Sequence, residues 1–342
     1  MLQAVWRDKF GSVSYYLKLM EKSDKSFKLP GSQNHTATTI SDTTQAAPVT
    51  EPSGTRTWLL EKYKSEILAN KALPLLTLFT SWNDSPSKYL IHNITVNNWV
   101  SLRPYVIPVV FTNESALENE CIKNGWEVLP VPVAAAGGVP VLKYMYQNVM
   151  NKYNSSFYAF CNGDILFTDK LMDTLIAILN STVNITQPTL IVGQRTNVKN
   201  VTLEEGSTWN RVATIARTRG KLFTGWAEDF FITPRAYPWS EMPEVVIGRR
   251  AYDNWLVYNS RKSHYNVIDV TRSLLAVHQT DEAGNFEGHH HEHGDYNHNL
   301  LVKMYKRIKY NAGVIECIEK FTVFEKDVLI IKSRTLPKAC TV

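Results

Sequence analysis

Short apolar runs alternate with segments of helical apolar spacing along much of the chain. The runs at residues 73–81, 106–114 and 156–167 are typical of buried strands. Apolar residues recur at helical spacing over residues 57–70 and 88–104. This alternation predicts an open α/β domain, with a mixed, mostly parallel sheet flanked by helices.

The pattern continues through the middle of the chain and then changes. Further predicted elements are a short strand within 121–131, helices over 137–153 and 169–179, and a strand over 188–195. In the second half we expect a strand with an acidic start within 226–238, a loop leading into a helix over 247–262, and one or two short strands within 266–279. Residues 280–299 are rich in Gly and His and predict a mobile loop rather than a zinc site.

Residues 22–57 differ in composition from the rest of the chain. They are rich in Ser, Thr, Pro and Gly and contain almost no large apolar residue. Such a segment cannot bury enough surface to offset its ordering entropy, so it predicts a disordered linker, either a stalk or a plain tail. We therefore divide the chain into a disordered N-terminal stalk, residues 1–57, and a folded domain, residues 58–342.

Composition and charge narrow the class of protein. With 342 residues, of which 44% are hydrophobic and 20% charged, the chain can bury a sizeable core. The net charge of +5 fits binding of anionic small molecules and is too diffuse to indicate nucleic acid. No apolar stretch reaches the roughly 18 residues of a membrane helix, and Asp8 and Lys9 interrupt the N-terminus, so it does not resemble a signal peptide. Any membrane anchor is expected to lie outside this chain.

Cysteines and glycosylation sequons bear on the compartment. The four cysteines have no CxxC spacing, which argues against zinc or thioredoxin chemistry. Cys317 and Cys340 could close a short loop, or all four could be free thiols. Asn-x-Ser/Thr sequons, which matter only in the secretory pathway, favour a lumenal or extracellular location. They occur at Asn34, Asn83, Asn93, Asn113, Asn154, Asn180, Asn184 and Asn200.

Polar residues follow the predicted strands where an α/β sheet binds its ligands. The run at 157–161 breaks abruptly into Asn162-Gly163-Asp164 before apolar residues resume. Ser81 and Arg195 also fall at predicted strand ends. Because ligands of open α/β sheets bind beyond the carboxyl ends of strands, these residues are candidates for a binding site.

Taken in order, these segments resemble nucleotide-diphospho-sugar transferases of the GT-A type. The resemblance covers about residues 73–299 and rests on an ordered series of short motifs. They are LTLFTSWNDSPSKYLIHNITVNNWVSLRP, GGVPVLKYMYQNV, YAFCNGDILF, EDFFITPR, IGRRAYDNWL, LLAVHQ and GDYNH. The resemblance implies a GT-A (Rossmann-like) fold and a metal-assisted transfer from a nucleotide sugar.

The resemblance also implies a metal site. The usual Asp-x-Asp motif reads Asn162-Gly163-Asp164 here, so one carboxylate is replaced by an amide. Asp164 is the expected first ligand for Mn²⁺ or Mg²⁺, and His278 matches the late histidine that completes the metal or diphosphate site. The structural alternatives are that the motif forms a turn and that His278 is a buried structural residue.

Carboxylates on the acceptor side are candidates for catalysis. Asp253 is expected to be the catalytic base of an inverting transfer, although it could instead cap the following helix. Glu228 and Asp229 are expected to bind acceptor or donor hydroxyls.

The donor itself is expected to contact several predicted strand ends. Thr80, Ser81, Asn162, Gly163 and Arg195 are the expected contacts to the nucleotide sugar. Arg249 and Arg250 are further candidates for the diphosphate or for the site carboxylates. Of Trp226, Trp239 and Trp255, we expect at least two to pack in the core rather than stack on a sugar.

The resemblance, together with the sequons and the predicted stalk, implies a hexosyl- or pentosyltransferase of the secretory lumen. We expect it to be located in the Golgi and to be a type II membrane protein when full length. Its donor is expected to be a UDP-sugar and its acceptor a glycan or glycoconjugate. The alternative is a non-catalytic GT-A fold that binds carbohydrate or a protein partner. A nucleotidyltransferase would want a Gly-rich basic loop after the first strand, and the sequence SWNDSPS is neither.

Overall fold

A computed structural model describes residues 54–281, 292–326 and 328–342 of the chain. These residues belong to the compact unit Glu51–Val342. The predicted linker, apart from its last four residues, lies outside the described residues. So do residues 282–291 of the predicted loop, including His289, His290 and His291.

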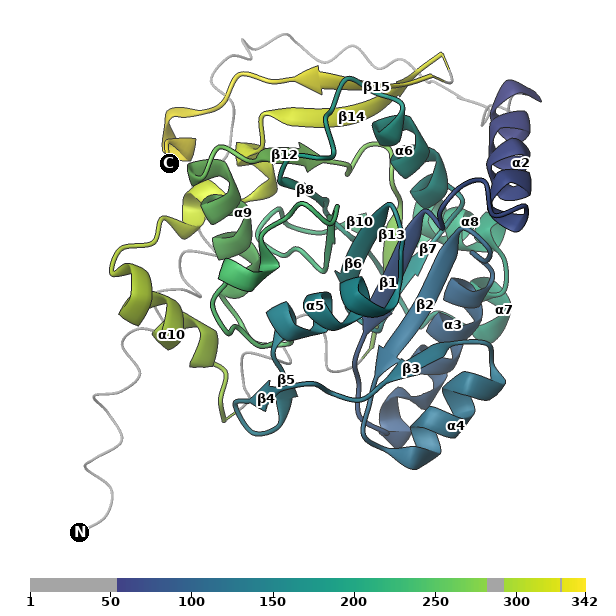
Figure 1. Cartoon of the computed structure of the whole chain (residues 1–342), viewed down its shortest axis with the longest axis horizontal. Helices are drawn as coiled ribbons and strands as arrows, with labels where there is room; N and C mark the ends of the chain where they lie inside the picture. Colours follow the sequence, from purple (N-terminus) through teal and green to yellow (C-terminus); the bar gives the residue numbers. More distant parts are fainter. Residues whose placement is uncertain (1–53, 282–291, 327) are drawn as a thin grey trace, which may run out of the picture. The chain divides into compact units, whose positions relative to one another are not determined.

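A nine-stranded sheet forms the centre of the unit (Figure 1). Its strand order is β15-β14-β12-β8-β11-β6-β1-β2-β3. The strands are β1 (Leu76–Thr80), β2 (Val106–Phe111), β3 (Glu127–Leu129), β6 (Phe157–Cys161), β8 (Thr189–Val192), β11 (Phe230–Thr233), β12 (Asn266–Asp269), β14 (Lys320–Glu325) and β15 (Val328–Ser333).

Most strands of this sheet run parallel. β1 pairs in parallel with both β2 and β6, while β11 runs antiparallel between β6 and β8, and β15 antiparallel to β14. The mixed, mostly parallel sheet with flanking helices confirms the predicted fold class. From β1 the chain builds outward through β2 and β3 on one side, and β6 is added on the other. The direction of the strand order therefore reverses between β1 and β6, which is where open α/β sheets bind ligands.

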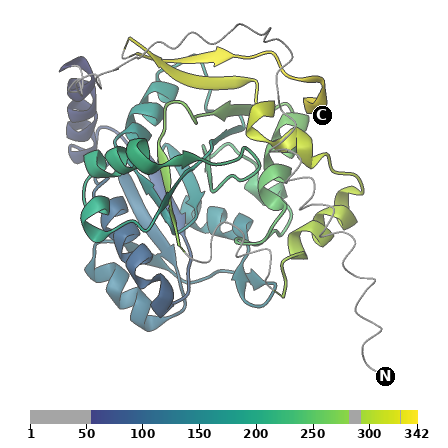
Figure 2. The same cartoon turned by 180° about the vertical axis from the view of Figure 1, so that it is seen from behind.

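A second, four-stranded sheet has the order β10-β9-β13-β7. Its strands are β7 (Ile165–Phe167), β9 (Thr196–Lys199), β10 (Lys221–Leu222) and β13 (Ala276–Thr280), and a two-stranded hairpin is formed by β4 (Ala134–Ala135) and β5 (Val139–Pro140). The helices α7 (Leu203–Gly206) and α8 (Trp209–Arg219) lie next to it (Figure 2). Only the three residues Asn162-Gly163-Asp164 separate β6 of the central sheet from β7 of the second sheet, so the two sheets meet there.

Helices cover both faces of the central sheet. α3 (Tyr89–Val100), α4 (Ser115–Lys123) and α6 (Lys170–Leu179) bury apolar residues against one face, and α5 (Leu142–Lys152) and α9 (Tyr252–Lys262) against the other. The remaining helices are α2 (Gly54–Leu68), α10 (Tyr296–Tyr305) and the short turns η1 (Pro86–Lys88), η2 (Trp239–Glu241), η4 (Tyr310–Gly313), η5 (Ile315–Cys317) and η6 (Lys338–Cys340). Among the described residues, no helix is both long and apolar enough to cross a membrane.

Two buried side chains of α3 fix the start of the second sheet. The amide of Asn98 donates to the carbonyl of Phe167 at 2.9 Å and its oxygen accepts from the Phe167 amide at 2.8 Å. The indole of Trp99 donates to the carbonyl of Ile165 at 2.8 Å and stacks on Trp126 at 5.1 Å. Satisfying these buried polar groups holds β7 in one register, and with it the preceding residue, Asp164.

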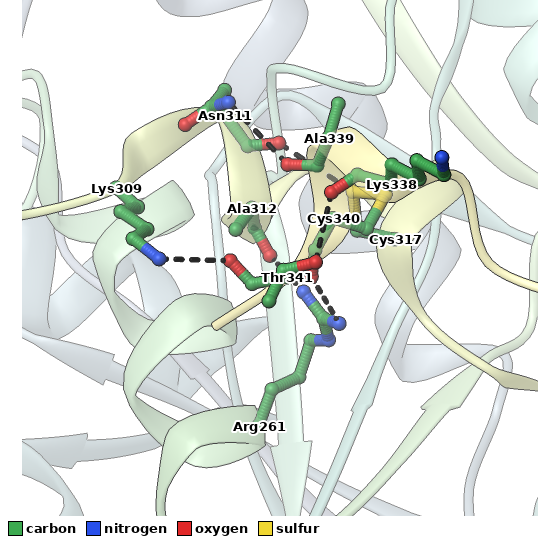
Figure 3. The surroundings of a disulfide bond; sticks show 9 residues. All are labelled: Arg261, Lys309, Asn311, Ala312, Cys317, Lys338, Ala339, Cys340 and Thr341. Carbon is green, nitrogen blue, oxygen red and sulfur yellow. Dashed lines mark hydrogen bonds between the residues drawn. A yellow bond between two sulfur atoms is a disulfide. The ribbon is translucent and has the colours of Figure 1, made fainter.

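A disulfide joins Cys317 to Cys340, whereas Cys121 and Cys161 are buried free thiols (Figure 3). Of the alternatives that the sequence left open, the structure contains the disulfide. Beside it, Arg261 of α9 donates to the carbonyls of Ala312 and Cys340, the latter at 2.8 Å. The C-terminal residues are thereby tied to the helix that begins next to Asp253.

Replacing both Cys317 and Cys340 with serine is expected to lower the free energy of unfolding by about 3 kcal/mol, because the crosslink spans 23 residues. Urea denaturation under non-reducing conditions measures this change. A reductant should lower the stability of the parent by a similar amount and leave the double variant unaffected. An unchanged parent midpoint after reduction would contradict the expectation.

Candidate functional site

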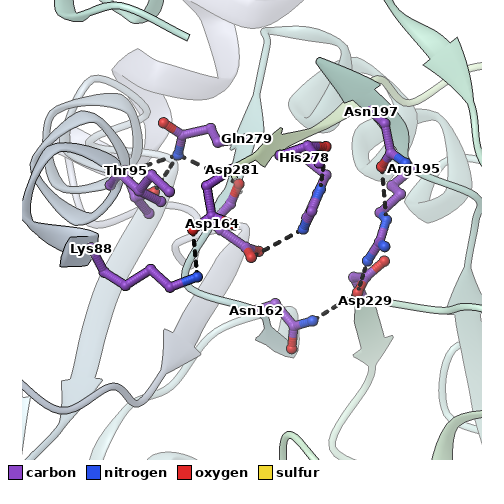
Figure 4. Close-up of polar contacts among 12 residues, drawn as sticks. Lys88, Thr95, Asn162, Asp164, Arg195, Asn197, Asp229, His278, Gln279 and Asp281 are labelled. Carbon is purple, nitrogen blue, oxygen red and sulfur yellow. Dashed lines mark hydrogen bonds and ion pairs between the residues drawn. The ribbon is translucent and has the colours of Figure 1, made fainter. Parts of the chain in front are cut away.

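Asp164 and His278 face each other where the two sheets meet. Asp164 lies between β6 and β7, and His278 on β13 pairs with Ile165 across the antiparallel ladder. Nε2 of His278 lies 3.1 Å from Oδ2 of Asp164, and Nδ1 lies 3.0 Å from the hydroxyl of Thr280 (Figure 4). These two contacts fix the orientation of the ring, with Nε2 toward the carboxylate of Asp164 and Nδ1 toward the hydroxyl of Thr280.

The carboxylate of Asp164 lies in an environment that favours its charged form. Burial opposes ionisation, but His278 and then Arg195 more than offset it, so the pKa of Asp164 lies below its usual value. Its second oxygen, Oδ1, is buried and accepts no hydrogen bond. A buried carboxylate oxygen without a donor is costly unless a ligand completes it.

These two residues fit a divalent cation that is partly held by its substrate. The described part of the chain contains no group of three or more His, Cys, Asp or Glu side chains arranged to hold a metal ion alone. Mg²⁺ and Mn²⁺ sites, however, commonly use one or two protein ligands together with phosphate oxygens and water. Oδ1 of Asp164, which has no hydrogen-bond partner, and Nε2 of His278, which faces Oδ2 of the same carboxylate, are the protein atoms that would hold such a cation.

Arg195 and Asp229 form a buried ion pair beside this site. Nη1 of Arg195 lies 2.5 Å from Oδ1 of Asp229, and the two side chains are only 5% and 7% exposed. The amide of Asn162 donates to the same oxygen at 2.7 Å, and Nε of Arg195 donates to Asn197 at 3.0 Å. The structure therefore places Arg195 and Asn162, two predicted donor contacts, as partners of Asp229.

Glu228, Asp229 and Asp253 come together as an acidic group. Glu228 and Asp229 immediately precede β11, while Asp253 lies in the first turn of α9. Asn254 donates to Oε2 of Glu228 at 3.1 Å. The other oxygen of Glu228, together with Oδ2 of Asp229 and Oδ1 of Asp253, is buried without a hydrogen-bond partner. Three neighbouring carboxyl groups, each with one buried oxygen that lacks a hydrogen-bond partner, indicate a binding place for a ligand with hydrogen-bond donors.

Burial and mutual repulsion raise the pKa of two of these acids. Burial raises the pKa of Asp253 to about 7; backbone hydrogen bonds act in the opposite direction, and like-charge repulsion from Asp229 adds to the rise. The pKa of Glu228 is raised well above its usual range by burial and by the charges of Asp253, Asp229 and Glu316. A carboxyl group that titrates near neutrality is suited to accept a proton at physiological pH.

The predicted contacts after β1 take different roles. Thr80 is fully buried, and its hydroxyl has no hydrogen-bond partner. The hydroxyl of Ser81 donates to the carbonyl of Phe111 at 2.7 Å and so joins the ends of β1 and β2. At Gly163 a Cβ would lie 2.6 Å from the ring of Trp82, so this position must lack a side chain for Trp82 to pack there.

Trp82 was not predicted to belong to the site. Its ring stacks on His92 at 4.6 Å, and its indole nitrogen is buried without an acceptor. Burial lowers the pKa of His92 to about 4, although Asp164 acts in the opposite direction. The signal in the sequence is the position of Trp82, two residues after β1 at the carboxyl edge of the sheet.

Asn297 also escaped prediction and fixes the loop before α9. It is fully buried, accepts from the amide of Val246 at 2.8 Å, and donates to the carbonyls of Val246 and Arg249 at 2.9 and 3.0 Å. Next to it, Asp295 forms an ion pair with Arg250. The GDYNH motif therefore holds the loop that carries Arg249 and leads to Asp253.

Other predicted aromatic and histidine residues serve packing. Trp239 stacks on Tyr146 at 3.6 Å, and Trp255 is also buried, which confirms core roles for two of the three tryptophans. His298 lies 3.1 Å from the hydroxyl of Tyr310. An open hollow of about 640 Å³ lies between α4 and β3, away from these residues, and includes none of the candidate site residues.

No protein-family model matches the chain, and no curated protein matches it. Among solved structures, it is similar to glucosyl-3-phosphoglycerate synthase from Mycobacterium tuberculosis in complex with Mg²⁺ and UDP. That similarity has 8% identity and a TM-score of 0.39 and covers 81% of this chain and 92% of the other.

Two further solved structures share the same level of similarity. One, from Desulfovibrio desulfuricans, is described as a proposed nucleotide-diphospho-sugar transferase. The match has 8% identity and a TM-score of 0.33 and covers 68% of this chain and 98% of the other. The inositol-1-phosphate CTP transferase from T. maritima has 12% identity and a TM-score of 0.32, covering 62% and 91%. Because these similarities are low, we infer function from the residues of the site.

Replacing Asp253 with Asn is expected to stabilise the protein above pH 7 by roughly 2 kcal/mol. The folded state holds the Asp253 proton up to about pH 7, whereas an unfolded Asp loses it near its ordinary value of 3.8. Between these values the folded state binds more protons, so this group makes stability fall as pH rises. The gain of the variant should shrink as pH falls towards 4.

Urea denaturation of the parent and the variant over this pH range measures the effect. Glu118→Gln, an exposed residue of α4, is the matched control and should give no such pH-dependent difference. A variant that is less stable than the parent above pH 7 would show that the charged carboxylate is held favourably.

Proposed function

We propose that the chain is a glycosyltransferase that moves a sugar from a nucleotide-diphosphate donor, a UDP-sugar, to a glycan or glycoconjugate acceptor. The observation that carries the proposal is the ionised Asp164 beside His278, with one buried oxygen unpartnered, at the carboxyl edge of the sheet next to its topological switch point. Glu228 and Asp253, whose pKa values are raised rather than lowered, lie at the same edge. Such a pairing suits a donor site beside an acceptor site.

On the donor side, Asp164 and His278 are the residues that would hold Mn²⁺ or Mg²⁺. When bound, the cation would offset the negative charge that develops on the departing diphosphate. Asp164 supplies the negative charge that attracts the cation, and Thr280 orients His278. Thr80 and Trp82 each have a buried donor group without a partner in the same region, which supports contact with the nucleotide.

On the acceptor side, Asp253 is the proposed base. In an inverting transfer, an acceptor hydroxyl attacks the anomeric carbon, the bond from that carbon to the diphosphate breaks, and Asp253 takes the hydroxyl proton. Its pKa of about 7 supports this role. Glu228 and Asp229 would accept hydrogen bonds from neighbouring hydroxyl groups, and the ion pair with Arg195 orients Asp229.

The proposed location is the lumen of the secretory pathway, specifically the Golgi. The Cys317–Cys340 disulfide supports an oxidising compartment. Six sequon asparagines have exposed side chains, so they are accessible to glycosylation: Asn83, Asn113, Asn154, Asn180, Asn184 and Asn200. Asn93 is half-buried within α3, and Asn34 lies outside the described residues.

Calorimetric titration of UDP into the purified protein tests the donor site. We expect micromolar binding with Mn²⁺ that is lost in EDTA, because the diphosphate and the cation complete each other's coordination. Asp164→Asn and His278→Gln should each weaken binding roughly tenfold or more. The matched control Glu118→Gln should bind like the parent.

The outcomes separate the alternatives. Absence of UDP binding in both conditions would favour a non-catalytic module that binds carbohydrate or protein. Equal binding in Mn²⁺ and EDTA would remove the cation from the proposal. Tight UDP binding without transfer to any acceptor in a glycan panel would leave nucleotide recognition without catalysis.

Secreted expression in eukaryotic cells tests the proposed compartment. We expect peptide N-glycosidase to lower the mass of the protein by several glycans, with modification confined to exposed sequons such as Asn154 and Asn184. Asn93 should stay unmodified, since its side chain is half-buried and its carbonyl accepts from Asn97 within α3. Peptide mapping after glycan removal determines which sequon asparagines carried a glycan. A secreted protein without glycans would count against a lumenal role.

A further inference from the structure

A concentrated positive surface lies at the end of α10. Lys303, Lys306, Arg307 and Lys309 place four cations within seven residues, and all four side chains are exposed. Apolar side chains lie between them, with Met304 52% and Tyr305 37% exposed. We call residues 302–309 the basic surface.

Negative charge is excluded from this part of the chain. Residues 296–315 contain no Asp or Glu. At the start of α10, Asp295 is already paired with Arg250. The elements packed nearby bring further cations, since η4 packs on α9, which ends at the exposed Lys262, and on η6, which begins at the exposed Lys338. The four cations of the basic surface stand against a net charge of only +5 for the whole protein.

The basic surface is attached to the framework of the protein. At one end of α10, Asn297 holds the loop before Asp253 through three backbone hydrogen bonds. At the other, the ring of Tyr305 packs on Trp255 with ring centres 5.4 Å apart. Nζ of Lys309 donates to the carbonyl of Thr341 at 3.2 Å. These contacts give the cations fixed backbone positions, which lowers the entropic cost of binding a partner.

We propose that the basic surface binds an acidic glycan, a polysaccharide carrying carboxylate or sulfate groups. Lys and Arg clusters of this density attract regularly spaced anions, and Arg can grip a sulfate or carboxylate with two hydrogen bonds. The exposed Tyr305 offers an aromatic edge for a sugar ring between the cations. The exposed apolar residues of α10 are too few and too dispersed among the cations to anchor a helix in lipid, which favours a glycan over a membrane.

This inference goes beyond the proposed function and does not depend on it, since binding requires neither donor nor cation. If both hold, the position of α10 relates the two. Two contacts connect α10 to the start of α9, where Asp253 lies. Asn297 of α10 donates to the carbonyl of Arg249, and Tyr305 of the basic surface packs on Trp255 of α9. A long acidic glycan held at the basic surface would be retained near the acceptor side of the site.

Fluorescence anisotropy with a labelled heparin fragment, using the full chain at low ionic strength, tests the proposal. The variant carries Lys303→Gln, Lys306→Gln and Arg307→Gln; Lys309 is kept because it bonds to Thr341. We expect affinity to fall about tenfold, since three exposed ion contacts that each contribute modestly are lost together. Affinity of the parent should also fall steeply with added salt.

The matched control removes the same charge elsewhere, through Lys71→Gln, Lys123→Gln and Lys221→Gln, all at exposed positions. It should keep affinity within about twofold of the parent. Equal loss in both triple variants would mean that only net charge matters and would overturn the proposal. So would parent binding to anionic phosphatidylserine vesicles that exceeds binding to heparin. UDP titration of the same variants tests the donor site separately, and the affinity for UDP should be unchanged in both triple variants.

Discussion

The buried ion pair between Arg195 and Asp229 is the interaction on which the site depends. Arg195 follows β8, Asp229 precedes β11, and Asn162 follows β6, so one carboxylate oxygen joins the ends of three strands of the central sheet. Through Nε, Arg195 also reaches Asn197 on β9 of the second sheet. Removing one partner of such a pair leaves an uncompensated buried charge, which is strongly destabilising.

The ion pair also separates two electrostatic environments at one sheet edge. On one side, Asp164 has a lowered pKa because His278 and Arg195 outweigh its burial. On the other, Asp253 and Glu228 have raised pKa values because burial and like charges dominate. Carboxyl groups whose environments shift their pKa values in opposite directions are suited to different tasks.

Much of the fold followed from the sequence, because a strand buried on both faces has to be apolar. β1, β2, β6 and β8 coincide with predicted runs, and the polar break at Asn162-Gly163-Asp164 lies at the sheet edge as expected. Within the small second sheet, β9 and β10 were not predicted, nor was α8, since the short strands and the polar helix leave little apolar pattern. Likewise, the C-terminal hairpin of β14 and β15 is mostly half-exposed and shows no long buried run.

The site itself was only partly accessible from sequence. The resemblance brought Asp164 and His278 together, and the strand order explains their proximity. Arg195 was expected to contact the diphosphate, and its pairing with Asp229, 34 residues away, follows from the insertion of β11 between β8 and β6. Asn297 gave no signal as a buried anchor because its role depends on a loop about 50 residues earlier in the chain.

The contacts of Arg261 have a consequence for how the protein is made. This side chain holds α9 to the carbonyls of Ala312 and Cys340, which lie 51 and 79 residues further along the chain. The helix of Asp253 is thus braced by residues that are synthesised well after it. The acceptor half of the site would therefore be completed only after these later residues are synthesised and the cysteines are oxidised, so a variant truncated just before Cys340 would keep its central sheet and lose that brace.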